Sequence, residues 1–220
     1  MSEPQGSLPT ALPRHAMATV APEAWRAMLA SRPDLAGEPL VETWADAARP
    51  LVARRSVEGD PPQTTPLGLP LPPAQGKRRI AVSLPRAAVL AVTPPPRLDD
   101  ARSAAPPAWR PTIVELLALD DQVRTYGSLA WAWLTGLAYL SASSDLDLLW
   151  TLPEPASLDP LLAGIAAIAA RAPMRIDGEI VGAAGAVHWR ELQGGGEVMV
   201  KHPTGVRLMT REAFLAGGRP

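Results

Sequence analysis

The distribution of proline is the feature that most limits what this chain can fold into. The 220 residues include 26 prolines, and 20 of them lie within residues 1–111. Proline fixes φ and removes a backbone donor, so it interrupts helix interiors and central strands. Glycine shows the opposite trend, with five up to residue 111 and twelve after it. We therefore predict two domains, a proline-rich α+β domain at 1–107 and an α/β domain at 108–220.

The predicted elements after residue 111 indicate an α/β core with a mixed sheet. Helices are predicted at 112–119, 129–137, 157–171 (with Ser157 as N-cap) and 210–216. Strands are predicted at 122–126, 146–152, 175–181, 187–192 and 198–202, and the last two form a hairpin across the glycines at 194–196. In the first half, the pattern predicts a helix at 22–31, strands at 51–55 and 79–84, and an irregular connection over 59–76.

Charge and composition exclude several classes of protein. The formal net charge is −1, which argues against a strongly basic nucleic-acid-binding protein. The chain has no cysteine, so disulfides, thiolate zinc sites and cysteine nucleophiles are excluded. No window reaches the roughly 18 apolar residues of a transmembrane helix, and no targeting segment is visible. We expect a cytoplasmic protein that acts neither on nucleic acid nor at a membrane.

Two acidic residues interrupt an apolar run in the second half. Asp145 and Asp147 are two apart, so on a strand their side chains share one side while Leu146 and Leu148 face a core. Neighbouring carboxylates repel one another, and a divalent cation relieves that repulsion. Hard oxygen ligands of this kind suit Mg²⁺ or Mn²⁺, with phosphate oxygens completing the coordination. Taken alone, such a pair is more often a solvated strand end.

Gly127 and Ser128 stand where a predicted strand turns into a helix. Such a turn exposes backbone N–H groups at a helix N-terminus, which is a ready phosphate site. Gly127 allows close approach of the phosphate, and the Ser128 hydroxyl adds a donor. A lone Gly-Ser pair is usually only a turn. Combined with Asp145 and Asp147, it describes a triphosphate cradle beside a metal platform.

These residues resemble a known signature. Gly127-Ser128 followed by Asp145-Leu146-Asp147 is similar to the motif of the nucleotidyltransferase superfamily, which has the DNA polymerase β-like fold. The 16 residues at 129–144 exceed the usual spacing, which predicts a short insertion around 139–144. The run from 127 to 149 resembles in particular the phosphoribosyl-dephospho-CoA transferase of malonate decarboxylase, the holo-acyl-carrier-protein synthase. Weaker similarity covers 12–15, 51–55, 68–72, 76–80, 177–179 and 187–192.

The resemblance implies a reaction and its participants. In this family a serine hydroxyl of the apo acyl carrier protein of malonate decarboxylase attacks the α-phosphorus of 2′-(5″-triphosphoribosyl)-3′-dephospho-CoA. Diphosphate leaves and a phosphodiester forms, with Mg²⁺ or Mn²⁺ as the implied metal. The nucleophile comes from the partner, which agrees with the absence of cysteine in this chain. One departure is Ala16, where an Asp is expected after Arg14-His15, so no role is assigned to that pair.

A two-metal site also needs a third carboxylate on a neighbouring strand. Asp177 and Glu179 are two apart on a predicted strand, and analogy with the fold favours Asp177 over Glu179. The alternative is that both only close a turn at Gly178. The predicted metal ligands are Asp145, Asp147, Asp177 and Glu179, and the first three are the predicted catalytic residues.

The sequence allows more than one role for the remaining basic residues and more than one function for the chain. Lys201 either reaches the triphosphate beside Gly127 and Ser128 or is an edge-strand lysine that blocks pairing. The residues at 54–55 and 77–79 form a docking face for an acidic carrier, a grip on donor phosphates, or a solvated loop. The alternative functions are a different nucleotidyltransferase, which moves a nucleotide to a small molecule or protein, and an inactive binding module of the same fold.

Overall fold

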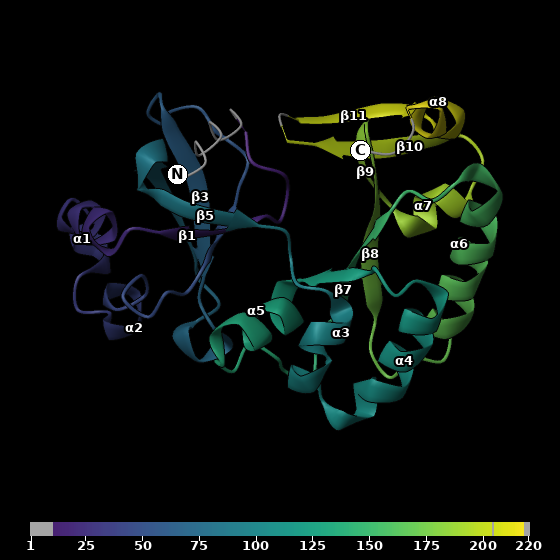
Figure 1. The fold of residues 1–220 in the computed structure, drawn as a ribbon, viewed down its shortest axis with the longest axis horizontal. Coiled ribbons are helices and arrows are strands. Elements are labelled where there is room, and N and C mark those ends of the chain that lie inside the picture. The colour runs from purple at the N-terminus through teal and green to yellow at the C-terminus, as the bar shows by residue number, and fades with distance from the viewer. Residues whose placement is uncertain (1–10, 204, 218–220) are drawn as a thin grey trace, which may run out of the picture. The chain divides into compact units, whose positions relative to one another are not determined.

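The computed structural model describes residues 11–203 and 205–217, and the chain divides into two compact units (Figure 1). The first unit runs to Pro94 except for residues 72–76, which belong with Pro95 onward to the second. The boundary predicted from the sequence lies later, after residue 107. Residues 95–107 lie in the second unit because Leu98, Ala101 and Ala105 are buried in its core.

The first unit is built on an antiparallel sheet with strand order β4-β3-β2-β1-β5. Its strands are β1 (Met17–Val20), β2 (Leu51–Ala53), β3 (Thr64–Pro70), β4 (Arg79–Pro85) and β5 (Val89–Thr93). Its helices are α1 (Pro22–Ala30), η1 (Pro33–Leu35), α2 (Pro39–Glu42) and η3 (Arg86–Ala88), while η2 (Pro73–Gln75) lies in the 72–76 segment. The expected helix and both expected strands are confirmed, and the proline-rich half is α+β.

The expectation of an irregular connection over 59–76 is wrong, because β3 occupies its middle. Thr65, Leu67 and Leu69 alternate with less buried neighbours, which is the spacing of a strand with one buried face. β3 has a strand on each side only at Leu67–Gly68, where β2 pairs with it. Pro66 and Pro70 lie outside that stretch, so neither removes a donor from a doubly paired position.

A polar cluster fixes the loop that follows β2. The guanidinium of Arg54 pairs with the Asp60 carboxylate and donates to the carbonyl of Leu67 (3.1 Å). Ser83 Oγ also donates to Asp60 (2.7 Å). The hydrogen bond from Arg54 is the main reason that the pKa of Asp60 lies well below its usual range. Arg54 is therefore engaged inside the unit, and Arg78, from the same predicted basic face, pairs with Glu38.

The second unit contains a mixed sheet with strand order β11-β10-β9-β8-β7-β6, in which only β7 and β8 pair in parallel among the described strands. Its strands are β6 (Arg124–Tyr126), β7 (Leu146–Thr151), β8 (Ile176–Gly182), β9 (Gly185–His188), β10 (Glu197–His202) and β11 (Gly205–Thr210). Its helices are α3 (Leu98–Ala101), η4 (Arg102–Ala104), η5 (Pro107–Trp109), α4 (Arg110–Leu119), α5 (Gly127–Thr135), α6 (Pro155–Ala169), α7 (Trp189–Gln193) and α8 (Arg211–Ala216). The mixed α/β class is confirmed.

Two local expectations for this unit are wrong. The predicted hairpin over 187–202 is interrupted by α7, since Trp189 and Leu192 are buried at helical spacing. β9 and β10 still pair in an antiparallel sense on either side of that helix. Ser157 is not the N-cap of α6, because the helix already starts at Pro155, a residue favoured in the first turn.

The two faces of this sheet differ sharply in chemistry. Leu146, Leu148 and Trp150 of β7 lie in the core that also contains residues of α4 and α6. Those two helices lie against each other on that side of the sheet (Figure 1). Asp147 alternates with these residues and therefore lies on the opposite face, which α4 and α6 do not cover and which we call the open face. Within the described part of the chain, every helix is too short or too polar to cross a membrane.

Candidate active site

Strand register brings two of the predicted carboxylates together. Asp147 of β7 and Asp177 of β8 are direct partners in the parallel pair. Directly paired residues project from the same face of a sheet, so both carboxylates stand on the open face. Asp145 lies one residue before β7 and connects to the same group through Arg175. The three predicted catalytic residues therefore meet at one end of β7 and β8.

Gly127 lies directly against this group. It is the first residue of α5, and its φ of 62° falls in the left-handed region that favours glycine. A Cβ atom at this position would lie only 1.9 Å from Oδ2 of Asp147. Ser128 follows as a half-buried residue in the first turn of the helix. The structure thus brings the predicted phosphate cradle and the predicted metal platform into contact.

Arg175 is a site residue that the sequence analysis missed. It lies one residue before β8, and its guanidinium pairs with the carboxylates of Asp145 and Asp177, the latter at 3.3 Å. Its pKa is raised, first by the hydrogen bond to Asp145. The only sequence signal is its position two residues before Asp177, which places both side chains on one side of an extended chain.

His188 is the second site residue that the sequence pattern did not predict. It ends β9 and caps α7, where its Nδ1 accepts a hydrogen bond from the backbone N–H of Arg190 (3.1 Å). Because Nδ1 is the acceptor, Nε2 carries the proton and donates to Oδ1 of Asp177 (2.8 Å). The Gly178 N–H donates to the same oxygen (2.8 Å). Asp177 is thus held in one orientation by its neighbours.

Glu179 and Lys201 form a separate pair farther along the open face. Glu179 is only 2% exposed, and its Oε1 accepts a hydrogen bond from Lys201 Nζ of β10 at 2.7 Å. On β7 its register partner is Leu149, whereas Asp177 faces Asp147. Of the two acids on β8, Asp177 is therefore the one adjacent to the carboxylates of β7.

Cationic side chains pair with three carboxylates of this face. Arg175 pairs with Asp145 and Asp177, and Lys201 pairs with Glu179. In the conformation described over 11–203 and 205–217, no three Asp, Glu or His side chains converge closely enough to hold a metal ion, and Arg175 stands between two of the acids. The donor set nevertheless fits Mg²⁺, which prefers a few carboxylates supplemented by phosphate oxygens.

Comparison with known proteins assigns both units to one family. The phosphoribosyl-dephospho-CoA transferase MdcG N-terminal domain matches residues 13–95, and the corresponding C-terminal domain matches residues 97–212. The chain belongs to the phosphoribosyl-dephospho-CoA transferase family. The junction between the two matches coincides with the boundary between the structural units.

Relatives of this transferase cover nearly its whole length. A phosphoribosyl-dephospho-CoA transferase of Bradyrhizobium diazoefficiens is 44% identical over 93% of this chain and 92% of its own. Proteins of the same name from Xanthomonas campestris pv. campestris and Xanthomonas axonopodis pv. citri are 36% and 35% identical, over 80% and 91% of this chain and 86% and 95% of their own. No solved structure matches the chain.

The pairing with Glu179 leads to a prediction for Lys201. We expect Lys201→Met to lower the free energy of unfolding of the second unit by about 3 kcal/mol, because a buried carboxylate loses its cationic partner. Urea denaturation measures this change, and the double variant Lys201→Met with Glu179→Gln should recover most of it. If Lys201→Met instead leaves stability unchanged and raises the KM for the triphosphate donor, Lys201 binds the triphosphate.

Proposed function

We propose that this transferase moves the 2′-(5″-phosphoribosyl)-3′-dephospho-CoA group from its triphosphate precursor to a serine of an apo acyl carrier protein, with release of diphosphate. The carrier is proposed to be the subunit of malonate decarboxylase. The observation that supports this most is the contact between Gly127 and Asp147, which puts a helix N-terminus beside a group of carboxylates. Transfer of a nucleotide-like group from a triphosphate needs this combination of a phosphate cradle and a cation platform.

A divalent cation, Mg²⁺ or Mn²⁺, would be held by Asp145, Asp147 and Asp177, and it would supply charge neutralisation for the triphosphate. Glu179 stays the second choice as a ligand, since it pairs with Lys201. The finer assignment of the fold to the nucleotidyltransferase superfamily is part of the same proposal.

The chain's own residues account for the rest of the reaction. We assign the backbone N–H groups at Gly127 and Ser128, together with the Ser128 hydroxyl, to binding the triphosphate oxygens. Asp177 is assigned to accept the proton of the attacking serine at Oδ2. Its Oδ1 already accepts hydrogen bonds from His188 and Gly178. These two bonds hold the carboxylate in place before the reaction, so Oδ2, which also faces Nη2 of Arg175 (3.3 Å), needs no reorientation to accept the proton.

The experiment that tests the proposal is intact-protein mass spectrometry. The purified apo carrier is incubated with the transferase, Mg²⁺ and triphosphoribosyl-dephospho-CoA, and in parallel with ATP in place of that donor. The proposal expects a mass increase equal to the phosphoribosyl-dephospho-CoA group, absent from a carrier whose serine is replaced by alanine. Addition of AMP from ATP instead would favour a different nucleotidyltransferase.

Arg175 provides a prediction that does not depend on turnover. Its guanidinium offsets part of the charge on Asp145 and Asp177, so a divalent cation must compete with it. We expect Arg175→Ala to tighten Mn²⁺ binding about tenfold, which corresponds to about 1.4 kcal/mol. Titration followed by electron paramagnetic resonance measures the free Mn²⁺. The control is Arg171→Ala, which removes an exposed arginine that pairs with Glu115 and should leave Mn²⁺ binding unchanged.

A further inference from the structure

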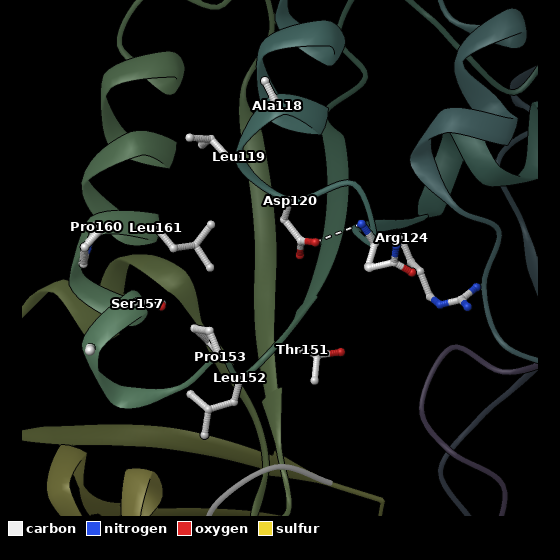
Figure 2. A pocket seen from close by; sticks show the side chains of 12 residues that line it. Ala118, Leu119, Asp120, Arg124, Thr151, Leu152, Pro153, Ser157, Pro160 and Leu161 are labelled. Atoms are coloured by element: carbon white, nitrogen blue, oxygen red, sulfur yellow. Dashed lines mark hydrogen bonds between the residues drawn. The ribbon is translucent and has the colours of Figure 1, made fainter.

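A cavity of about 820 Å³ lies at the other end of β7 (Figure 2). The end of α4, the chain leading into β6, the end of β7 and the first turns of α6 line it. Its walls are largely apolar, with Leu119, Leu152, Pro153 and Leu161 among them. The volume is in the range of pockets that hold a small ligand.

The cavity and the candidate active site share one strand. Thr151 lines the cavity and lies four residues after Asp147 on β7, so the two lie about 13 Å apart along the strand. Thr151 also projects from the same face as Asp147, because the two are separated by an even number of residues. α4 and α6, which line most of the cavity, lie on the other face, so a ligand that extends from the carboxylates reaches the cavity by crossing the sheet edge at Thr151.

The backbone at this end of β7 is open on one side. The pairing of β6 with β7 runs from Asp147 to Leu149 and stops there. Among the described residues, Thr151 has no strand paired with it on the β6 side, whereas the backbone groups of Trp150 point toward β8, as those of Leu146 and Leu152 do. An open strand edge binds extended ligands that carry amide groups, by hydrogen bonds of the kind found between strands.

The charges around the cavity disfavour a phosphate inside it. Asp120 lines the wall, and its Oδ1 accepts a hydrogen bond from the backbone N–H of Gln122 (2.8 Å). The side chain of Arg124 points away from the cavity in Figure 2, and its Nη1 donates to the carbonyl of Pro95 (2.6 Å). The carboxylate therefore faces the cavity more closely than the guanidinium does. A neutral ligand with apolar and amide groups fits these surroundings.

We propose that this cavity binds the pantetheine arm of the donor. The inference rests on the proposed function, since it takes the donor from there. The arm contains two amides joined by short methylene segments and a carbon bearing two methyl groups, which match an open strand edge between apolar walls. It also lies beyond the adenosine and its 5′-diphosphate, well away from the reacting phosphorus. The cavity thus recognises the part of the donor that does not react.

Two substitutions from opposite walls test the assignment. Ala118 of α4 and Ala156 of α6 are both exposed and line the cavity, so tryptophan fits at either position but fills the space. The control is Ala163→Trp, at an exposed position of α6 outside the lining. Isothermal titration with dephospho-CoA and with ADP, which lacks the arm, separates the contribution of pantetheine.

We expect wild-type protein to bind dephospho-CoA at least about tenfold more tightly than ADP, and Ala118→Trp and Ala156→Trp to abolish that difference. Ala163→Trp should preserve it. Equal binding of the two compounds by wild type, or an undiminished difference in both cavity variants, would overturn the proposal. The carrier-modification assay distinguishes the two proposals. If wild-type protein modifies the carrier normally but either of these binding results is negative, only the cavity assignment is overturned. If wild-type protein does not modify the carrier, the proposed function is overturned as well.

Discussion

Asp147→Asn should reduce the rate of group transfer by about 10²–10³-fold or more while the protein stays folded. Asp147 is the carboxylate that touches Gly127 and faces Asp177 across the β7–β8 pair, so it belongs to both parts of the site. The amide has nearly the same shape and keeps the packing of the open face. It removes the negative charge that a divalent cation needs, which is worth several kcal/mol in the transition state.

The measurement is the single-turnover rate of carrier modification, with thermal denaturation as the check on folding. Asp145→Asn is expected to behave similarly, because Arg175 joins the Asp145 carboxylate to that of Asp177 in the same group. Asp100→Asn is the control, since Asp100 is an exposed residue of α3. Near-normal turnover by both site variants would rule out the carboxylates as the cation platform.

Gly127→Ala is expected to have the second largest effect, for two separable reasons. The residue has a φ of 62°, a region that costs a residue with a side chain about 1–2 kcal/mol. In addition, the new Cβ would lie 1.9 Å from Oδ2 and 2.7 Å from Cγ of Asp147, so that carboxylate must move. A displacement of about 1 Å in a catalytic group can cost on the order of 10²-fold in rate.

Gly136→Ala separates the two reasons. Gly136 follows α5 as its C-terminal cap with a φ of 70°, and a Cβ added there has no atom within 4 Å. We expect both alanine variants to lose similar stability in urea denaturation, and only Gly127→Ala to lose most of its kcat. Equal kcat values for the two variants would show that the position of the Asp147 carboxylate does not depend on the absence of a side chain at Gly127.

The parts of the site that the sequence predicted are those defined by local spacing. Asp145 and Asp147 stand at the start of an apolar strand, and Gly127-Ser128 stands at a strand-to-helix turn, so a few neighbouring residues suffice to predict both. The same holds for most helices and for strands with clear alternation. The period of a strand or a helix is a local property of the chain.

Arg175 and His188 were missed because their roles arise from contacts across the sheet. His188 reaches Asp177 only because β9 pairs with β8 in a particular register, with His188 opposite Glu179. A shift of one residue would turn it to the other face. The pair of buried Glu179 and half-buried Lys201 likewise joins β8 to β10, which are not adjacent in the sheet. Neither registers nor sheet order can be read from one sequence.

Diphosphate release shows whether this site transfers a phosphoribosyl-dephospho-CoA group to a carrier serine, as we propose. Diphosphate and modified carrier are measured together in a single turnover with wild-type protein. We expect one diphosphate for each carrier modified, and none with a carrier that lacks the serine. Diphosphate released without modification of the carrier, or modification that persists in Asp147→Asn at the wild-type rate, would contradict the proposal.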